Sequence, residues 1–444
     1  MSGARILTFA SAAALSVSCL LVAPQAAGAA TGDITTFAGA NVDGPIGIVE
    51  GPDGNLWFTS RNNDRIGRIT PAGVVTTYAD PANLVDEPHD LEVGPDGNLW
   101  FTSRVNDRIG RIDPDASDPA STITTFPDTS IDRPLNIVAG PDGNIWWTNY
   151  DADTIGRLDP DDPATTITSF SDEAHPGSIN GPYGITVGPD GNVWFASSLS
   201  NRIGRITPAG SITTFADSRI DGPDSIVTGA DGRLWFTNVD NNRIGRISTS
   251  GTIKTFSDPG GTTSTDGPRG ITLGADGHIW YVSSENNRVG RVAANGAITT
   301  YSDPTATTGF PIGITAGPGG TLWYTSKDTN RLGRLTLPTC DGQVVTVVLG
   351  SGDQPTDGAD VIRGTAARDV VNAGEGDDRF CGRGGNDAFS GSSGADRAFG
   401  QGGNDSLNGG SGDDVLDGGP GSDSCAGQSG VDAATTCETI TGVP

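Results

Sequence analysis

A tryptophan recurs every 41 to 48 residues through the first three quarters of the chain. Each copy lies in one template, which reads P-x-x-I, then G-x-D-G, W-F-T, R-I-G-R-I and I-T-T-F. These runs of β-branched and aromatic residues are split by turn residues, so each copy predicts four short strands. Four antiparallel strands in roughly 40–45 residues make one blade of a β-propeller. The seven tryptophans of the template are Trp57, Trp100, Trp146, Trp194, Trp235, Trp280 and Trp323.

The two ends of the repeat supply a device that closes the ring. The segment "DITTFAG" (33–39) is an orphan copy of the outermost strand, whereas the seventh repeat ends at "RLGRLTLP" (331–338) without that strand. We therefore expect the N-terminal strand to complete the seventh blade and to remove its open edge. A solenoid of strands is the rival architecture, but it lacks a closing device. The prediction is an all-β fold with a seven-bladed propeller over residues 30–338.

Several template residues are interpreted as structural. Asp53-Gly54 favours a tight hairpin, because both positions can take positive φ. One tryptophan per blade packs most simply between neighbouring blades. The repeated Gly-Arg pairs, such as Gly67-Arg68, are also interpreted as structural, because seven identical positions around a ring rarely make one site.

Function is expected at one mouth of the central channel. If the P-x-x-I strand is innermost, the residue after its proline and the residue after W-F-T reach the same face of the ring. The first set varies between blades, as a binding surface would and as mere loop tolerance would too. The first set is Ile46, His89, Leu135, Tyr183, Asp224, Arg269 and Ile312, and the second is Ser60, Ser103, Asn149, Ser197, Asn238, Ser283 and Ser326. We predict the channel mouth at His89, Tyr183, Asp224 and Arg269.

The template of residues 33–338, with its W-F-T and R-I-G-R-I runs, closely resembles the streptogramin B (virginiamycin B) lyase family of seven-bladed propellers. The resemblance implies an elimination that opens the ester of a cyclic depsipeptide antibiotic, with magnesium. It also implies a histidine in a P-H-G start, a glutamate directly after W-F-T of the same blade, and a further histidine from a neighbouring blade.

The match to that machinery is partial. His89 occupies the histidine position, and Glu87 and Asp90 flank it, but Ser103 stands where the glutamate is expected. No blade has a glutamate there, and Glu285 comes two positions late. A general base and a metal-bound carboxylate need to be close together. The catalytic residues therefore stay unknown, with Glu87, His89 and Asp90 as candidates.

The other two histidines are expected elsewhere, His175 on a loop and His278 in a turn on the opposite face. Three hypotheses remain for the propeller, since a fold does not carry its chemistry with it. It is a binding platform for an extracellular sugar, peptide or wall polymer, a magnesium-dependent lyase acting on an ester, or a scaffold. The platform is preferred.

The composition changes after Pro338, where tryptophan vanishes and Gly and Asp dominate. Residues 355–435 divide without a gap into nine nonapeptides, with Asp at the sixth position of each and an apolar or small residue at the eighth. The rival interpretation is a disordered acidic linker, but a linker has no reason to place Phe, Leu or Val every nine residues. The segment resembles the hemolysin-type (RTX) calcium-binding repeat. Its sixth positions are Asp360, Asp369, Asp378, Asp387, Asp396, Asp405, Asp414, Asp423 and Asp432.

The resemblance implies a parallel β-roll in which two nonapeptides make one coil and calcium binds at the aspartates. Stacked carboxylates about 4.8 Å apart repel by roughly 3 kcal/mol at an effective dielectric near 20, so calcium should fold the roll. One edge offers four gaps between neighbouring turns and the other three, so at most seven sites are expected. The gap between Asp369 and Asp387 should be weak, because Ala367 replaces a turn glycine.

Residues 1–29 are interpreted as a signal peptide, with Arg5 at the start, an apolar run over 6–22 and an A-x-A cleavage site at 27–29. A membrane anchor is the rival, but the run is short. The mature chain is thus expected to be secreted, without a membrane span, and to act as a monomer. A formal charge of −27 argues against nucleic acid and suits cations.

Four cysteines remain after Cys19 is removed with the signal, and an oxidising exterior permits two disulfides. We favour Cys340–Cys381 and Cys425–Cys437, with two buried free thiols as the alternative. The expected division is a signal peptide (1–29), propeller (30–338), linker and capping strand (339–354), calcium roll (355–435) and C-terminal cap (436–444). The partners are calcium and an unknown extracellular ligand or small molecule.

Overall fold

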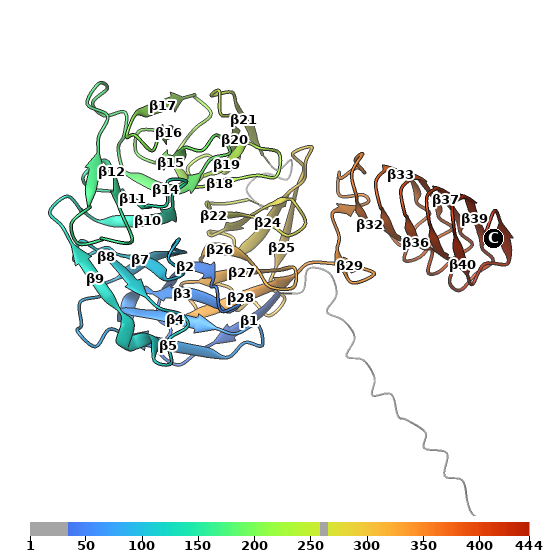
Figure 1. Ribbon diagram of the computed structural model, residues 1–444, viewed down its shortest axis with the longest axis horizontal. Coiled ribbons are helices and arrows are strands. Elements are labelled where there is room, and N and C mark those ends of the chain that lie inside the picture. Colours follow the sequence, from blue (N-terminus) through green and yellow to red (C-terminus); the bar gives the residue numbers. More distant parts are fainter. Residues whose placement is uncertain (1–33, 258–264, 444) are drawn as a thin grey trace, which may run out of the picture.

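The computed structural model describes residues 34–257 and 265–443. Within these residues it contains seven four-stranded antiparallel sheets arranged as a ring, followed by a narrower coil of parallel strands beside it (Figure 1). The all-β class, the seven blades and the roll are confirmed. The predicted signal peptide, residues 1–29, lies outside the described residues, as does Cys19.

Each blade runs outward from the channel in strand order, and its strands match the four runs of the template. The innermost strands are β2 (Pro45–Glu50), β6 (Pro88–Val93), β10 (Pro134–Ala139), β14 (Pro182–Val187), β18 (Pro223–Thr228), β22 (Pro268–Leu273) and β26 (Pro311–Gly317). The second strands are β3 (Leu56–Ser60), β7 (Leu99–Ser103), β11 (Ile145–Asn149), β15 (Val193–Ser197), β19 (Leu234–Asn238), β23 (Ile279–Ser283) and β27 (Thr321–Ser326). The third strands are β4 (Arg65–Ile69), β8 (Arg108–Ile112), β12 (Thr154–Leu158), β16 (Arg202–Ile206), β20 (Arg243–Ile247), β24 (Arg288–Val292) and β28 (Arg331–Thr336). The outer strands of blades one to six are β5 (Val75–Ala79), β9 (Thr124–Pro127), β13 (Thr168–Phe170), β17 (Ile212–Ala216), β21 (Ile253–Phe256) and β25 (Ile298–Ser302).

The ring closes as predicted. Strand β1 (Ile34–Ala38) pairs antiparallel with β28, with Ile34 opposite Leu335 and Ala38 opposite Arg331. The N-terminal strand therefore forms the outer edge of blade seven, where Figure 1 shows it beside the last propeller strands. Helix is limited to two short 3-10 segments, η1 (Arg61–Asn63) and η2 (Pro119–Thr122), and no helix in the described part of the chain could cross a membrane.

The template tryptophans form the core between blades, as predicted. Trp57, for example, has no exposed surface and packs against Leu91 and Phe101 of the next blade. Its indole N–H donates to Oδ1 of Asp53 at 3.0 Å. In the Asp53-Gly54 turn only Gly54 has a positive φ, of 70°. The predicted hairpin is present, since β2 and β3 pair antiparallel across this turn, but Asp53 does not take the positive φ that was expected of it.

The Gly-Arg pair of the third strand is structural too. A Cβ added at Gly67 would lie 2.1 Å from the ring of Phe58, so the phenyl ring of W-F-T needs a glycine beneath it. The guanidinium of Arg68 lies 5.9 Å from the centre of the Trp57 ring. The same stacking recurs in blades two, three, four, five and seven and adds a cation–π contact to each of these blades.

The roll consists of two parallel sheets, and between the nonapeptides their neighbouring strands are shifted by eighteen residues, as in Ile362 opposite Phe380. One coil therefore contains two nonapeptides. The first sheet contains β31 (Val347–Val348), β32 (Val361–Arg363), β34 (Arg379–Cys381), β36 (Arg397–Phe399), β38 (Val415–Asp417) and β40 (Ala433–Thr435). The second contains β33 (Val370–Glu375), β35 (Ala388–Ser393), β37 (Ser406–Ser411), β39 (Ser424–Ser429) and β41 (Thr439–Thr441). The eighth positions face inward and form one core cluster with Val347.

The two disulfides have the predicted pairing. Cys340 is bonded to Cys381, with 5.8 Å between their Cα atoms, and Cys425 is bonded to Cys437, with 6.0 Å. Both separations lie in the normal range for a disulfide. The first bond ties the hairpin of β29 (Thr339–Cys340) and β30 (Gln343–Val344) to the roll. Free thiols at these positions are excluded.

The connector between propeller and roll ends in a buried carboxylate, Asp353. Its Oδ2 accepts a hydrogen bond from Nη2 of Arg291 at 2.8 Å, and its Oδ1 lies 3.2 Å from Nε2 of His278. Arg291 also donates through Nε to Asp276, at 3.0 Å. Burial alone would lower the pKa of His278, but its contacts with Asp276 and Asp353 raise it to about 9. Two buried cations of blade six thus hold the start of the roll.

The contact of Asp353 with Arg291 and His278 is the joint between the propeller and the roll. Its position follows from how the ring closes. In blades three, four and seven the arginine equivalent to Arg291 donates to a turn carbonyl of the next blade, as Arg334 does to Pro71 at 2.8 Å. Blade seven has no such turn, because its outer strand comes from the N-terminus. Asp353 fills the position that the turn would take.

Candidate functional site

The start of each inner strand and the end of each second strand meet at one face of the ring. Pro45 pairs with Ser60, Pro88 with Ser103, and the same register recurs in the other blades. A cavity of about 210 Å³ lies in the channel and is lined by residues of all seven inner strands. The predicted mouth residues His89, Tyr183 and Asp224 are among its lining residues.

The last residue of each second strand is sealed inside this face. The hydroxyl of Ser60, for example, accepts the N–H of Asp43 at 2.8 Å and donates to Asn63 at 2.7 Å. These residues therefore fasten the loops between blades and are closed to a ligand. The set, with no exposed surface in any blade, is Ser60, Ser103, Asn149, Ser197, Asn238, Ser283 and Ser326.

His89 and Tyr183 meet across the channel from blades two and four. Nε2 of His89 lies 3.1 Å from the Tyr183 hydroxyl, and the two rings pack edge to face at 5.6 Å. Burial, and then the nearby positive charges of Arg104 and Arg61, lower the pKa of His89 to about 3. The imidazole is thus neutral at neutral pH and is a weak proton acceptor.

Glu87 is occupied by two arginines. Its Oε2 accepts Nε and Nη2 of Arg61 at 2.9 and 2.8 Å, and Nε of Arg104 lies 2.8 Å from the same oxygen. Burial alone would raise the pKa of Glu87, but the two guanidiniums hold it below its usual value. Glu87 therefore stays ionised and paired, which is unsuitable for a general base.

Asp90 faces the channel instead. Its Oδ2 accepts Nδ2 of Asn136 at 3.0 Å and the N–H of Ile137 at 3.2 Å. Burial raises the pKa of Asp90 to about 6 and that of Glu92 to about 7. Residues two apart on a strand share a face, so β6 turns both carboxyl groups into the channel. Glu92 and Asn136 were not predicted as site residues, although Glu92 alternates with Asp90 on β6 and Asn136 holds the template position of Asp90 in the next blade.

A second cluster joins blades five, six and seven. Nη1 of Arg269 donates to Oδ2 of Asp224 at 3.2 Å, and burial raises the pKa of Asp224 to about 6. Two cations lie near the Phe310 ring, with the Arg269 guanidinium at 5.3 Å and Lys327 Nζ at 5.2 Å from its centre. The four predicted mouth residues thus form two contacting pairs, and His89, Tyr183 and Asp224 line the same cavity.

The remaining histidines lie away from the mouth. The His175 side chain is 77% exposed and lies 3.3 Å from Asp172 on its loop. His278 lies at the opposite end of the blade, in the joint with Asp353. A further histidine beside His89, as the resemblance implied, is therefore missing, and so is a carboxylate in place of Ser103.

The sixth-position aspartates of the roll stand in two columns, one on each edge. The N–H of each of the first seven aspartates donates to Oδ1 of the aspartate eighteen residues later, at 2.7 to 3.0 Å. The first column is Asp360, Asp378, Asp396, Asp414 and Asp432, and the second is Asp369, Asp387, Asp405 and Asp423. The resemblance implied this arrangement.

The second carboxylate oxygen of most of these residues has no hydrogen-bond partner although it is buried. A Cβ placed on Gly400 would lie 2.3 Å from Oδ2 of Asp405 and 2.7 Å from the carbonyl oxygen of Gly418, so the two oxygens converge on one point. Convergent buried oxygens are the donor set that calcium prefers. The unpaired oxygens are Oδ2 of Asp378, Asp387, Asp396, Asp405, Asp414, Asp423 and Asp432.

The first coil differs from the rest. Oδ2 of Asp360 accepts the N–H of Thr356 at 2.6 Å, and Oδ2 of Asp369 accepts that of Thr365 at 2.7 Å. The weakness predicted for the gap after Asp369 stays a prediction, with Thr365 as a further reason beside Ala367. In five gaps the earlier aspartate keeps an unpaired Oδ2: Asp378–Asp396, Asp387–Asp405, Asp396–Asp414, Asp405–Asp423 and Asp414–Asp432.

Burial raises the pKa of these turn aspartates more than the repulsion between neighbouring carboxylates does. Burial first, and neighbouring carboxylates second, raise the pKa of Asp378 to about 7 and that of Asp396 to about 6. We had expected repulsion between stacked carboxylates to be the main cost of folding the roll without calcium. No group of three or more His, Cys, Asp or Glu side chains gathers in the described part of the chain. A calcium ion at these turns would therefore need backbone carbonyls or water among its ligands.

Comparison with known proteins places these features. The pattern of the virginiamycin B lyase family matches residues 26–179 and 168–356. The RTX calcium-binding nonapeptide repeat matches residues 355–389 and 390–425, which implies calcium binding. A search of curated proteins finds no match.

Solved structures agree with the family pattern. A streptogramin B lyase structure is 30% identical over 68% of this chain and 96% of its own, with a TM-score of 0.60. A catalytically inactive histidine-to-alanine variant of virginiamycin B lyase from Staphylococcus aureus with quinupristin is 32% identical over 69% of this chain and 99% of its own, with a TM-score of 0.61. The WD40 propeller of Doa1, 15% identical over 69% of this chain and 96% of its own, with a TM-score of 0.55, shares the fold alone.

Proposed function

The chain belongs to the virginiamycin B lyase family, and we propose that it is an exported calcium-binding protein whose propeller mouth binds an extracellular ligand. Two disulfides and calcium repeats suit an oxidising, calcium-rich exterior. Mass spectrometry of the secreted protein should place the mature N-terminus near Ala30. An intact N-terminus on a protein retained in the cell would contradict export.

The observation that carries the binding role is the charge at the mouth. Two guanidiniums share the single carboxylate of Glu87, and Arg104, Arg61 and Arg133 all lower the pKa of the neutral His89 beside them. Arg133 is paired with Asp151 at 3.2 Å, so the surplus of positive charge comes from Arg61 and Arg104 on one carboxylate. In a chain with a formal charge of −27 this surplus favours a ligand with a carboxylate or phosphate group.

Aromatic rings lie next to these cations. The guanidinium of Arg133 lies 4.9 Å from the ring centre of Tyr150, and Tyr150 packs edge to face with Tyr183 at 6.4 Å. An apolar or sugar group of the ligand would contact these rings, since aromatic faces accept both. The ligand class we favour is thus an acidic peptide, sugar or wall polymer.

An array of short peptides and glycans, each with and without a carboxylate or phosphate, tests this proposal at saturating calcium. We expect the acidic members to bind and Arg104→Gln to weaken them about tenfold, since a charge-assisted hydrogen bond is lost. Arg233→Gln is the matched control, because Arg233 pairs with Asp231 in a turn on the opposite face. Equal binding of neutral members, or no binding at all, would contradict the proposal.

A lyase is the second candidate, and the position of His89 favours it. Asp90 and Glu92, with pKa values of about 6 and 7, are better matched to proton transfer near neutral pH than His89 itself. The residues present do not make a magnesium site of three or more side chains in the described chain, and Ser103 is buried where a glutamate was expected.

Incubation with a streptogramin B and magnesium separates the two candidates. We expect the intact antibiotic to persist. Its loss, abolished by His89→Ala, would make the propeller a lyase.

A further inference from the structure

Beyond the last nonapeptide the chain adds one more strand to the roll, with fewer residues between this strand and its neighbour. Within the repeats, neighbouring strands are eighteen residues apart, as in Leu407 opposite Cys425. In the final coil Cys425 lies opposite Ile440, which is fifteen residues later. The chain is therefore three residues short of the next sixth position, and the sequence has no aspartate there.

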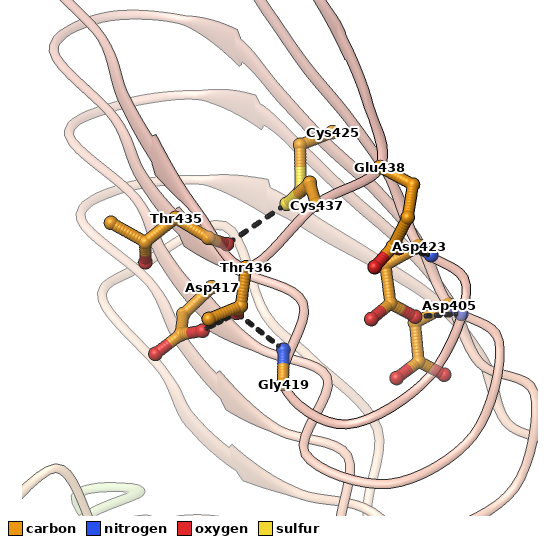
Figure 2. Close-up of a disulfide and its surroundings, with 9 residues drawn as sticks. All are labelled: Asp405, Asp417, Gly419, Asp423, Cys425, Thr435, Thr436, Cys437 and Glu438. Carbon is orange, nitrogen blue, oxygen red and sulfur yellow. Dashed lines mark hydrogen bonds between the residues drawn. A yellow bond between two sulfur atoms is a disulfide. The ribbon is translucent and has the colours of Figure 1, made fainter.

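Glu438 takes the place of that missing aspartate. In the column, the N–H of Asp405 donates to Oδ1 of Asp423 at 2.7 Å. The N–H of Asp423 in turn donates to Oε2 of Glu438 at 2.5 Å, and Figure 2 shows the three residues in line. Glutamate has one methylene more than aspartate, which suits the shorter connection.

A backbone carbonyl also continues the pattern. A Cβ placed on Gly418 would lie 2.7 Å from Oδ2 of Asp423 and 2.5 Å from the carbonyl oxygen of Thr436. At Gly400, one coil earlier, the corresponding atoms are Oδ2 of Asp405 and the carbonyl oxygen of Gly418. The same two kinds of oxygen therefore converge at the end of the roll as inside it.

The Asp423 carboxylate has an oxygen free for a cation. Asp423 is 2% exposed, and its Oδ2 has no hydrogen-bond partner. A buried carboxylate oxygen without a partner is costly, and a bound cation would remove that cost. This oxygen points to a ligand independently of the acidic residues around it.

The terminal segment is held in place on both sides of Thr436. The disulfide Cys425–Cys437 ties it to the core, and the Thr436 hydroxyl accepts the N–H of Gly419 at 2.7 Å and contacts Asp417 (Figure 2). Glu438 follows the disulfide directly. Its carboxylate is thus brought to the column by a covalent bond and does not depend on a repeat motif.

We propose that Asp423, Glu438 and the carbonyl of Thr436 form an additional site for calcium or a similar hard divalent cation at the C-terminal end of the roll. The proposal rests on the proposed calcium binding by the repeats, but two of its three ligands, Thr436 and Glu438, lie beyond residue 425, where the matched repeats end. The site ends the stack with a bridged turn and closes the last coil.

Calcium stoichiometry of the full chain tests the site, measured by equilibrium dialysis against calcium. We expect Glu438→Gln to bind one ion fewer than the unmodified protein. Glutamine keeps an oxygen that can accept the Asp423 N–H, so a purely structural role would be preserved. Glu438→Asp should also lose the ion, because the shorter side chain does not span the gap.

The control is Glu173→Gln, which removes one carboxylate from an exposed propeller loop and should leave the stoichiometry unchanged. Peptide mapping of the disulfide and far-UV circular dichroism at saturating calcium confirm that each variant is folded. Equal stoichiometry in Glu438→Gln and the unmodified protein would overturn the terminal site alone. Absence of bound calcium in both would overturn the calcium role of the roll as well.

Discussion

The propeller and the roll are both built from repeats, but they satisfy their buried polar groups in opposite ways. In the propeller the acidic turn residue accepts its own tryptophan N–H, as Asp53 does from Trp57 at 3.0 Å. In the roll the equivalent acidic residue keeps one buried oxygen unpaired, as in Asp396. The buried acidic group of the propeller repeat is satisfied within the protein, whereas that of the roll repeat needs a cation. The difference predicts that calcium controls one half of the molecule and not the other.

The core side chains sharpen this contrast. Each blade buries a tryptophan and a second aromatic ring, and these rings contact the neighbouring blade. The roll buries one residue per nonapeptide, and some of these are as small as Ala398. Apolar burial stabilises by about 25 cal/mol per Å², so the roll has less to set against its chain entropy.

Removal of calcium should give the largest effect. With EGTA, we expect the full chain to lose the far-UV circular dichroism of the roll while its near-UV signal stays, because all tryptophans lie in the propeller. The effect should reverse on adding 10 mM calcium, about ten times the weak end of extracellular modules. A far-UV spectrum unchanged by EGTA would show that the roll folds without calcium, and would contradict the predicted difference between roll and propeller.

Truncation of a core residue in each part should show two kinds of loss. Trp194→Ala should destabilise the propeller by about 3–5 kcal/mol, measured by urea unfolding, and the loss should be the same with and without calcium. Leu416→Ala should cost the roll about 2–5 kcal/mol and appear as a higher calcium midpoint. A calcium-dependent loss in Trp194→Ala would instead show that the two parts unfold as one unit.

The joint is where the two parts meet, and it should report on both. Asp353→Asn leaves Arg291 and His278 without one of their buried carboxylates, so we expect a cost of about 3 kcal/mol in unfolding and a higher calcium midpoint. Asp328→Asn serves as the control, because Asp328 is 62% exposed and its ion pair is long, at 4.0 Å. Equal behaviour of the two variants would mean that Asp353 does not hold the roll.

Acid should partly replace calcium. Without calcium, the pKa of Asp378 is about 7 in the folded roll, above the value of about 4 in an unfolded chain. Protonation therefore favours the folded state, and this contribution is present below pH 4 and is lost as the pH rises through 7. In EGTA we expect more roll structure at pH 5 than at pH 8 by circular dichroism. A decrease on acidification would show that other carboxylates dominate.

The sequence predicted what repeats and chain order determine. Trp57 and its equivalents predicted the blades, and the orphan strand predicted how the ring closes. The nonapeptide repeat predicted the two aspartate columns. Ser60 was placed on the correct face, but its burial was missed, because burial depends on the loop that folds over it. Thr356 and Glu438 were missed because the motif is defined by the sixth position alone.

Long-range contacts account for the other misses. Asp353 meets Arg291 across 62 residues of sequence, and nothing in either local pattern marks them as partners. The resemblance predicted a catalytic group around His89, yet its neighbours are set by Tyr183 and Arg104 from other strands. One sequence does not show which residues at the channel mouth contact each other, because the contacting residues come from different blades.

A crystal structure of the full chain grown with calcium tests the central claim most directly, with anomalous scattering used to locate the cations. The account predicts cations in the five gaps whose earlier aspartate keeps an unpaired Oδ2, from Asp378–Asp396 to Asp414–Asp432, and none buried between blades. Empty gaps in a folded roll, or cations only in the propeller, would contradict it.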